Sequence, residues 1–150
     1  MKIYDTLLAP NPRRVRWVMA EKGITDIPVV TLNLMAGEHK TPEYVGKAGL
    51  ANVPMLELDD ATCITESLAI CRYLESLYPE PNLFGRDPLE TAVIEMWTRR
   101  GEMLFATPMM HGVRHTHPAM AALEAQVPAI GEHNLAAATR ALKILNRQLE

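Results

Sequence analysis

The chain is poor in cysteine. Its 150 residues contain two, Cys63 and Cys71, and their separation matches neither a C-x-x-C pair nor the spacing of a zinc site. We therefore expect no metal centre and no disulfide framework. Cys71 lies on the apolar face of an expected helix, where a packing role is more common than chemistry. Without a disulfide framework, a reducing cytoplasmic setting is expected.

Strong net charge and long apolar runs are also lacking. The net charge is −3 and the pI about 6.0, so no basic footprint for nucleic acid is present. No apolar run approaches the roughly 20 residues of a membrane span, and residues 1–5 indicate the start of a strand rather than a signal peptide. We expect neither a nucleic-acid partner nor a membrane. The chain is 48% apolar, which is enough for a buried core.

The first 80 residues alternate between strand and helix patterns. Asn11-Pro12 and Thr41-Pro42 each combine a capping residue with a proline at the expected first helical position. A third helix is expected from Ser67. Strands are expected at residues 2–8, 28–34, 55–58 and 62–64. The order is βαβαββα, so we predict an α/β domain over residues 1–80.

After an expected linker at residues 81–88, every signal is helical. A long helix is predicted over residues 89–115, and Pro108 inside it must kink the helix or interrupt its hydrogen bonds. Residues 128–131 are expected to form a loop before a second helix over residues 135–150. Two helices alone leave apolar faces without partners. We therefore predict that residues 89–150 are the start of an all-α C-terminal domain, incomplete as if truncated.

Residues 52–55 and 65–70 carry the most functional information. The first stretch places Val53-Pro54 directly before an apolar strand. With a cis Val53–Pro54 bond, the backbone N–H and C=O of Val53 would pair with an extended ligand, as a short strand added to an edge. The alternative is a trans proline that starts the strand, which is the common form of an X–Pro bond.

The second stretch puts an acid and a hydroxyl at a helix start. Glu66 and Ser67 lie where unpaired N–H groups and the positive end of the helix dipole favour a carboxylate. Ser67 adds a hydroxyl donor, and Glu66 adds a negative charge for an ammonium. Together they predict a receptor for the α-amino-acid head of a small peptide. The alternative is ordinary capping by Thr65, with Glu66 in the first turn.

These motifs and their spacing resemble the cytosolic glutathione transferases. The matching segments are residues 9–16 (APNPRRVR), 20–23 (AEKG), 37–44 (GEHKTPEY), 52–60 (NVPMLELDD) and 65–74 (TESLAICRYL). Residues 114–118 (RHTHP) look like a bacterial and fungal branch of that family. The resemblance implies a thioredoxin-like N-terminal domain, an all-α C-terminal domain and a homodimer. It also implies a detoxification reaction, in which the thiolate of the co-substrate glutathione attacks a small hydrophobic electrophile.

The resemblance assigns the glutathione-binding residues as well. Val53 matches the position whose backbone pairs with the cysteinyl part, and Pro54 matches the invariant cis-proline. Glu66 and Ser67 match the residues that hold the γ-glutamyl head. The positions near the glycine carboxylate are matched by His39, Lys40 and Asn52. The alternative for His39 and for Lys40 is a solvated loop position without a ligand.

The main departure from the family concerns the thiol. The family places a serine, cysteine or tyrosine in the loop after the first strand, and Ala9 occupies that slot here. A thiol with a pKa near 8.5 must still ionise near pH 7, and lowering its pKa by about two units needs about 2.7 kcal/mol of preference for the anion. The first helix start and Asn11 are the remaining donors, unless Asn11 is only an N-cap. A solvated face or a dimer rim is expected for Arg13, Arg14 and Arg16.

The long predicted helix supplies the other candidates. Residues recurring at spacings of three or four, hence on roughly one face, are Arg100, Leu104, Thr107, His111 and His115. The resemblance implies that this helix forms the wall over the thiol, with its first three candidates lining the electrophile site. Either histidine is predicted to activate a water or to donate to the thiolate. The alternative is two surface histidines beside a kink.

Two other functions remain open. One is glutathione-dependent reduction of disulfides or peroxides. The absence of a loop cysteine speaks against a mixed disulfide with the protein, but not against one with bound glutathione. The other is a non-enzymatic glutathione-binding or interaction module, which Ala9 favours and which Glu66 and Ser67 oppose.

Overall fold

The computed structural model describes residues 1–149, and these residues fall into two compact units. The first unit runs from Met1 to Phe84 and the second begins at Gly85. A sheet with helices forms the first unit, and the second is helical. Within residues 1–149, no helix has the length and hydropathy needed to cross a membrane.

The sheet has four strands in the order β2-β1-β3-β4. Strand β1 (Lys2–Asp5) pairs in parallel with β2 (Val29–Thr31) and antiparallel with β3 (Met55–Glu57). Strand β4 (Cys63–Thr65) pairs antiparallel with β3 at the edge. The strands are shorter than predicted, but the order of strands and α-helices, βαβαββα, is the predicted one.

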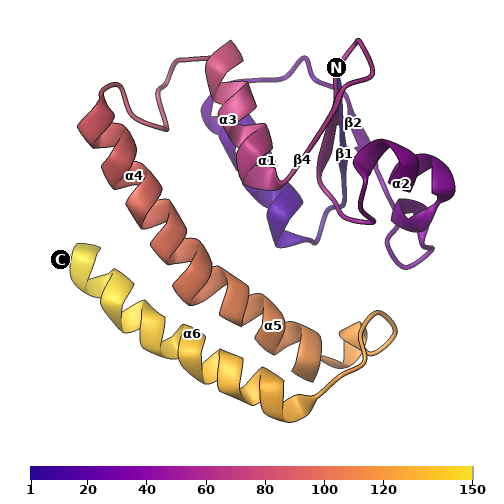
Figure 1. Ribbon diagram of the computed structural model, residues 1–150, viewed down its shortest axis with the longest axis vertical. Helices are drawn as coiled ribbons and strands as arrows, with labels where there is room; N and C mark the ends of the chain where they lie inside the picture. Colours follow the sequence, from indigo (N-terminus) through magenta and orange to yellow (C-terminus); the bar gives the residue numbers. More distant parts are fainter. Residues whose placement is uncertain (150) are drawn as a thin grey trace. The chain divides into compact units, whose positions relative to one another are not determined.

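Helices α1 (Pro10–Glu21) and α3 (Ser67–Leu77) lie side by side and share the core with the sheet (Figure 1). The core residues with 2% or less of their surface exposed include Ile3, Val15, Leu56, Ile70 and Leu74. Burying one such aliphatic side chain contributes about 1.5–3 kcal/mol. This packing fixes the N-termini of both helices relative to the strands.

Helix α1 begins one residue before the predicted cap. Ala9 takes the N-cap position with extended backbone angles and no side-chain cap, and Pro10 is the first helical residue. Asn11 lies inside the first turn, so its assignment as the N-cap is wrong. The physical reason is the fixed φ of proline, which suits the first helical position. With prolines at both positions 10 and 12, the earlier one starts the helix.

Helix α2 (Pro42–Ala48) has the predicted cap. Thr41 Oγ1 accepts a hydrogen bond from the Tyr44 backbone N–H at 3.3 Å, and Pro42 follows as the first helical residue. Gly49 ends the helix with φ 72°, a left-handed angle that favours glycine. A short 3₁₀ turn, η1 (Glu38–Lys40), precedes this helix.

A buried lysine ties the C-terminal end of α1 to α3. Lys22 Nζ lies 2.6 Å from Glu75 Oε2 and donates to the carbonyls of Tyr78 at 2.7 Å and Pro81 at 2.9 Å. The Lys22 side chain is fully buried. Burial of an ammonium is tolerated only with such partners, so this cluster anchors the segment that follows α3.

The second unit interrupts the single helix predicted over residues 89–115. Its elements are α4 (Pro88–Arg100), the π-helical segment η2 (Gly101–Ala106), α5 (Thr107–Thr116), the 3₁₀ turn η3 (Pro118–Met120) and α6 (Pro128–Leu149). Pro108 has no N–H and would crowd the carbonyl four residues earlier. That carbonyl lies in η2, where the wider i→i+5 turn accommodates the proline. The predicted interruption of the helix is confirmed.

The predicted loop over residues 128–131 is wrong, because α6 begins at Pro128. Gly131 belongs to α6 and is buried where this helix packs against α5. A Cβ there would lie 2.4 Å from Thr116 Cγ2 and 3.1 Å from the Gly112 carbonyl oxygen. The glycine serves the close approach of two helices, which run side by side in Figure 1. Glu150, the end of the helix predicted over 135–150, lies outside the described residues.

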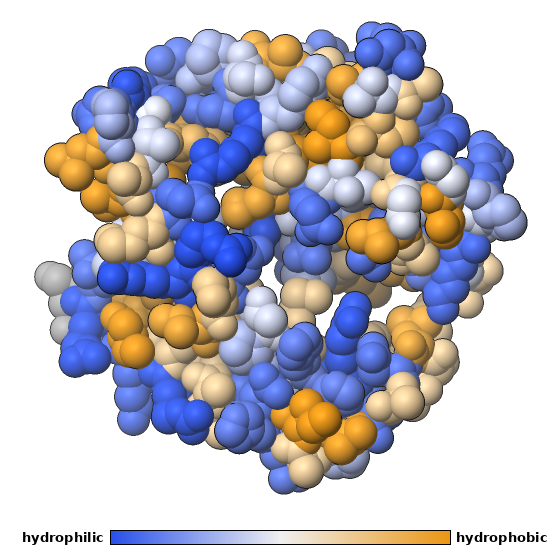
Figure 2. All heavy atoms as spheres, viewed as in Figure 1, coloured by the Kyte–Doolittle hydropathy of each residue, from blue (hydrophilic) through white to orange (hydrophobic). Residues whose placement is uncertain are grey.

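Apolar side chains also reach the surface. In Figure 2 they form separate patches among polar residues on the face in view. In the first unit, Leu7 and Leu8 of the loop after β1 and Trp17 of α1 are exposed. Scattered exposed apolar residues are normal for a folded protein, and the pair in the β1–α1 loop adjoins the slot of Ala9.

Candidate functional site

The Val53–Pro54 peptide bond is cis, so the alternative of a trans proline at the strand start is wrong. Pro54 and Met55 are buried, whereas Val53 is half-buried. Within residues 1–149, the backbone N–H and C=O of Val53 pair with no other backbone group. These two groups are therefore available to an extended ligand.

The strand register brings the two informative stretches together. Met55 on β3 is the partner of Thr65 on β4, so Pro54 and Glu66 flank a directly facing pair. Facing residues of an antiparallel ladder have Cα atoms about 4.5–5.5 Å apart. The cis-proline turn and the Glu66-Ser67 pair therefore meet at one end of the hairpin.

Glu66 takes the N-cap position of α3 without a side-chain cap bond, with φ 65° and ψ 113°. Thr65 is the last residue of β4, so the interpretation as ordinary capping by Thr65 is wrong. A positive φ is uncommon outside glycine and asparagine, and such backbone strain clusters at ligand sites. The Glu66 side chain is exposed, so its carboxylate can reach a ligand.

Ser67 is buried at the start of α3, and its Oγ accepts a hydrogen bond from Arg14 Nη1 at 3.0 Å. Arg14 comes from α1 and is half-buried. A solvated face is therefore wrong for Arg14, whereas Arg13 is exposed; the dimer rim stays a prediction for both residues. A signal was present in the sequence, because Arg14 lies four residues before Val18 and so borders the apolar stripe of its helix.

Asn52 is held by a tyrosine that the sequence analysis did not single out. Tyr44 Oη donates to the Asn52 carbonyl at 2.6 Å, so α2 fixes the turn that leads into Val53. Burial raises the pKa of Tyr44 to about 12, and the phenol therefore keeps its proton. A lone tyrosine in a short helix has no sequence pattern that indicates this role.

His39 and Lys40 lie in η1, on the connection between β2 and α2. Lys40 is exposed, but His39 is only 8% exposed, so a solvated position is wrong for His39. Burial and the positive charge of Lys40 lower the pKa of His39. His39 Nδ1 is buried without a hydrogen-bond partner among residues 1–149. A buried polar atom of this kind favours a partner from outside the chain.

The loop after β1 presents no hydroxyl or thiol at the slot of Ala9. Tyr4 Oη donates a hydrogen bond to Glu57 Oε2 at 2.9 Å. Arg16 pairs with the buried Asp5 and donates to the Leu7 carbonyl at 2.8 Å, so its assignment to a solvated face is also wrong. The remaining donors near this loop are the backbone N–H and the side-chain amide of the half-buried Asn11, because Pro10 and Pro12 have no N–H and the Arg13 N–H bonds to the Ala9 carbonyl.

The candidates in the second unit differ in exposure. His115 is half-buried, and the exposed residues are Arg100, Leu104, Thr107 and His111. The π-helical η2 changes the rotation per residue between Arg100 and Thr107, so a spacing of three or four across it no longer defines one α-helical face. The Arg100 guanidinium lies 4.7 Å from the Trp97 ring centre. The roles of all five residues remain predictions.

His115 is held in one tautomer by the loop before α6. The Val127 backbone N–H donates to His115 Nδ1 at 3.2 Å, so the neutral ring carries its proton on Nε2. Gln126 Nε2 holds the same loop by donating to the carbonyls of Arg114 and His117, each at 2.8 Å. The surface alternative fits the exposed His111, and for the half-buried His115 both interpretations stay predictions.

Neither cysteine is prepared as a thiolate. Burial raises the pKa of Cys71 to about 11, against a smaller lowering by the Arg14 guanidinium. Burial also raises the pKa of the half-buried Cys63. The burial of Cys71 confirms its predicted packing role. Across residues 1–149, no group of three or more His, Cys, Asp or Glu residues is placed to hold a metal ion.

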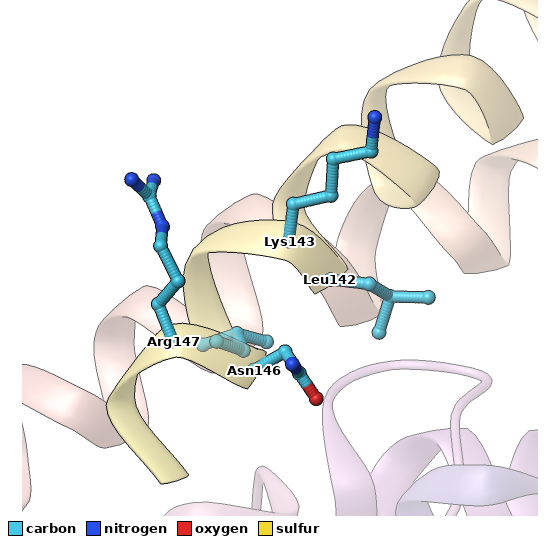
Figure 3. A pocket seen from close by; sticks show the side chains of 5 residues that line it. Leu142, Lys143, Asn146 and Arg147 are labelled. Carbon is cyan, nitrogen blue, oxygen red and sulfur yellow. The ribbon is translucent and has the colours of Figure 1, made fainter. Parts of the chain in front are cut away.

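A hollow beside the last turns of α6 is lined by Leu142, Lys143, Leu145, Asn146 and Arg147. Figure 3 shows that the labelled side chains fan outward in different directions instead of converging on one point. None of the predicted site residues lines this hollow. It therefore does not compete with the β3–β4 end of the first unit as the candidate site.

Comparison with known proteins identifies relatives of this architecture. The family described as glutathione S-transferase, N-terminal domain, matches residues 9–77. Glutathione S-transferase 2 of Saccharomyces cerevisiae is 42% identical over 121 residues, which are 80% of this chain and 52% of that protein. The chain thus spans about half the length of this curated relative.

Solved structures extend the similarity through both units. A glutathione S-transferase domain-containing protein of Marinobacter aquaeolei is 39% identical with a TM-score of 0.90, over 98% of this chain and 73% of that chain. The Gtt2 structure from Saccharomyces cerevisiae is 37% identical with a TM-score of 0.87, over 96% of this chain and 71% of that chain. The predicted thioredoxin-like fold followed by helices is confirmed, and the chain belongs to the glutathione S-transferase family.

Proposed function

We propose that this chain binds glutathione and conjugates the glutathione thiolate to a small hydrophobic electrophile. The observation that carries the proposal is the meeting of the cis Val53–Pro54 turn with Glu66 and Ser67 at one end of the β3–β4 hairpin. The backbone of Val53 pairs with the cysteinyl residue of glutathione. Glu66 and Ser67 hold the γ-glutamyl head, whose ammonium and carboxylate need an anion and hydrogen-bond donors.

The glycine end of glutathione is assigned to His39, Lys40 and Asn52. The unpartnered Nδ1 of His39 supports this assignment, because a buried ring nitrogen without a partner is costly. The exposed ammonium of Lys40 supplies positive charge beside it. The hydrogen bond from Tyr44 Oη to the Asn52 carbonyl holds Asn52 in the turn that leads into Val53.

Activation of the thiol is assigned to Asn11, His111 and His115. The backbone N–H of Asn11 lies in the first turn of α1, at the positive end of the helix dipole. His115 Nε2–H is a donor for the thiolate, since its Nδ1 accepts from Val127. The thiol loses its proton to solvent. The thiolate then forms a sulfur–carbon bond with the electrophile, whose leaving group departs with the electron pair of the broken bond.

The electrophile site is assigned to Arg100, Leu104 and Thr107. Within the first unit, the exposed Leu7 and Leu8 form apolar surface beside the slot of Ala9, which supports a hydrophobic substrate. Detoxification, a cytoplasmic location and a homodimer complete the proposal. Sedimentation velocity of the full chain tests the homodimer, and a monomer at micromolar concentration contradicts it.

A binding module without activity is the second candidate, and Ala9 is the observation that favours it. Two assays separate the candidates, one with a chlorinated dinitrobenzene and one with a glutathione mixed disulfide. Conjugation of the dinitrobenzene supports the transferase. Turnover of the mixed disulfide alone supports a reductase that uses bound glutathione. Inactivity in both assays with glutathione still bound leaves the binding module.

A further inference from the structure

Arg14 contacts a residue of the proposed glutathione site, but it has no assigned role in that site so far. Its Nη1 donates to Ser67 Oγ at 3.0 Å, across the interface between α1 and α3. A hydroxyl has two acceptor lone pairs and one proton. Because Arg14 occupies an acceptor side of the oxygen, the Ser67 hydroxyl can donate its proton to a ligand.

We propose that Arg14 sets the polarity of the γ-glutamyl head site, so that the ligand's α-carboxylate binds at Ser67 and its ammonium binds at Glu66. This inference rests on the proposed function. Arg14 acts through Ser67, so it is a positioning residue. It makes the hydroxyl a fixed donor and places a positive charge behind it, since hydrogen bonds with a charged partner are the stronger ones.

The surroundings of Arg14 support this role. Ser67 is 5% exposed, so the guanidinium acts on a group that is largely removed from water, where charges interact more strongly. The influence of Arg14 reaches Cys71, one turn further along α3, where it opposes the rise in the pKa of that thiol. On the other side, the exposed Glu66 supplies the negative charge at the same helix start. The two opposite charges match a zwitterionic head in one orientation only.

The test is a calorimetric titration of the full chain with two ligands. One is reduced glutathione, and the other is the same peptide with its γ-glutamyl α-carboxyl group converted to an amide. The proteins are wild type, Arg14→Met, Arg14→Lys and Arg13→Met. Arg13 is the matched control, because it is an exposed arginine on the same helix.

We expect Arg14→Met to weaken glutathione binding about ten- to a hundredfold, as for the loss of a charge-assisted hydrogen bond. The same variant should bind the amide within about threefold of wild type. Arg14→Lys keeps the charge and should recover part of the loss, and Arg13→Met should match wild type. Adding Ser67→Ala to Arg14→Met should cost little more, because the two side chains act as one unit.

Equal losses for both ligands would show a merely structural role and overturn the inference, while leaving the proposed function intact. Equal affinities of wild type for the two ligands would overturn it as well. Failure of wild type to bind glutathione contradicts the proposed function itself. If circular dichroism shows that Arg14→Met is unfolded, Arg14→Lys decides through its affinities for glutathione and for the amide. The inference is overturned if Arg14→Lys binds glutathione as tightly as wild type and shows the same ratio of the two affinities.

Discussion

Single side chains hold the turns on which the candidate site depends. Tyr44 donates to the Asn52 carbonyl, and Arg16 donates to the Leu7 carbonyl. In both cases a side chain from a helix fixes a loop carbonyl, and the loop then presents its remaining groups to solvent. Removing such a donor leaves the carbonyl without its partner, which is costlier than the bond itself suggests.

Tyr44→Phe should lower the free energy of unfolding by about 1–3 kcal/mol, the usual cost of leaving one hydrogen-bond partner unsatisfied. It should also weaken glutathione binding several-fold, because the turn before Val53 loses its anchor. Urea unfolding and calorimetric titration measure the two effects. Tyr73→Phe is the control, since Tyr73 is half-buried on α3. Equal effects of the two variants on binding would contradict the role of Tyr44.

The same residue predicts a dependence on alkaline pH. Burial raises the pKa of Tyr44 from 10.0 to about 12, so between these values the unfolded chain has lost a proton that the folded chain keeps. The free energy of unfolding should therefore fall as the pH rises from 10 to 12. Urea unfolding across this range should show a steeper fall for wild type than for Tyr44→Phe. Identical slopes would argue against the raised pKa.

At the scale of residues, the sequence predicted which motifs form the candidate site, but it did not predict the side chains that support them. Val53, Glu66 and Ser67 belong to short motifs with fixed spacing. Arg14 and Tyr44 act through contacts between helices or across a turn, and those contacts depend on packing that no local pattern encodes. The burial of His39 was missed for the same reason, because its neighbours in η1 are charged and indicate a loop.

At the scale of elements, the contact between α5 and α6 depends on glycine. A Cβ at Gly131 would meet Thr116 Cγ2 at 2.4 Å and His115 Cβ at 3.1 Å. Gly131→Ala should therefore lower the free energy of unfolding by about 1–3 kcal/mol, the usual cost of overpacking. Gly101→Ala is the control, because nothing lies within 4 Å of its added Cβ. A neutral Gly131→Ala in chemical unfolding would contradict this packing.

The ion pair between α1 and α3 offers a second test. Lys22→Met leaves Glu75 in a site with little solvent and should lower the free energy of unfolding by about 3–5 kcal/mol. The double variant Lys22→Met/Glu75→Gln removes the stranded charge and should be less destabilised than the single variant. Thermal and urea unfolding measure both. A double variant at least as unstable as the sum of the two single variants would refute a coupled buried pair.

Prolines and glycines explain where the predicted elements were right and wrong. Pro42 and Pro108 acted locally, as a helix start and an interruption, so the sequence located both effects. Pro128 and Gly131 were interpreted as a loop, although one starts α6 and the other makes room for α5. Proline and glycine occur both in loops and in helices, at the first helical position or at a close helix contact. Only the packing of the partner helix decides between these two positions. The shift of the α1 start from Pro12 to Pro10 reflects a choice between two prolines that are separated by Asn11.

At the scale of the whole molecule, the pairing of β3 with β4 brings together site residues that are separated in the sequence. Residues 52–54 and 66–67 meet because Met55 pairs with Thr65, and the alternation of strands and helices was enough to predict that hairpin. The helical unit carries the predicted activating histidines. Its internal packing depends on long-range contacts between α5 and α6, which the sequence pattern did not reveal.

The central claim is that the end of the β3–β4 hairpin binds glutathione, and calorimetric titration of glutathione into wild type and Glu66→Ala tests it most directly. Glu21→Ala is the control, because Glu21 is an exposed acid on α1. The account predicts binding to wild type and to the control, with at least about tenfold weaker binding to Glu66→Ala because the ammonium loses its charged partner. Unchanged affinity in a folded Glu66→Ala, or no binding to wild type, would contradict it.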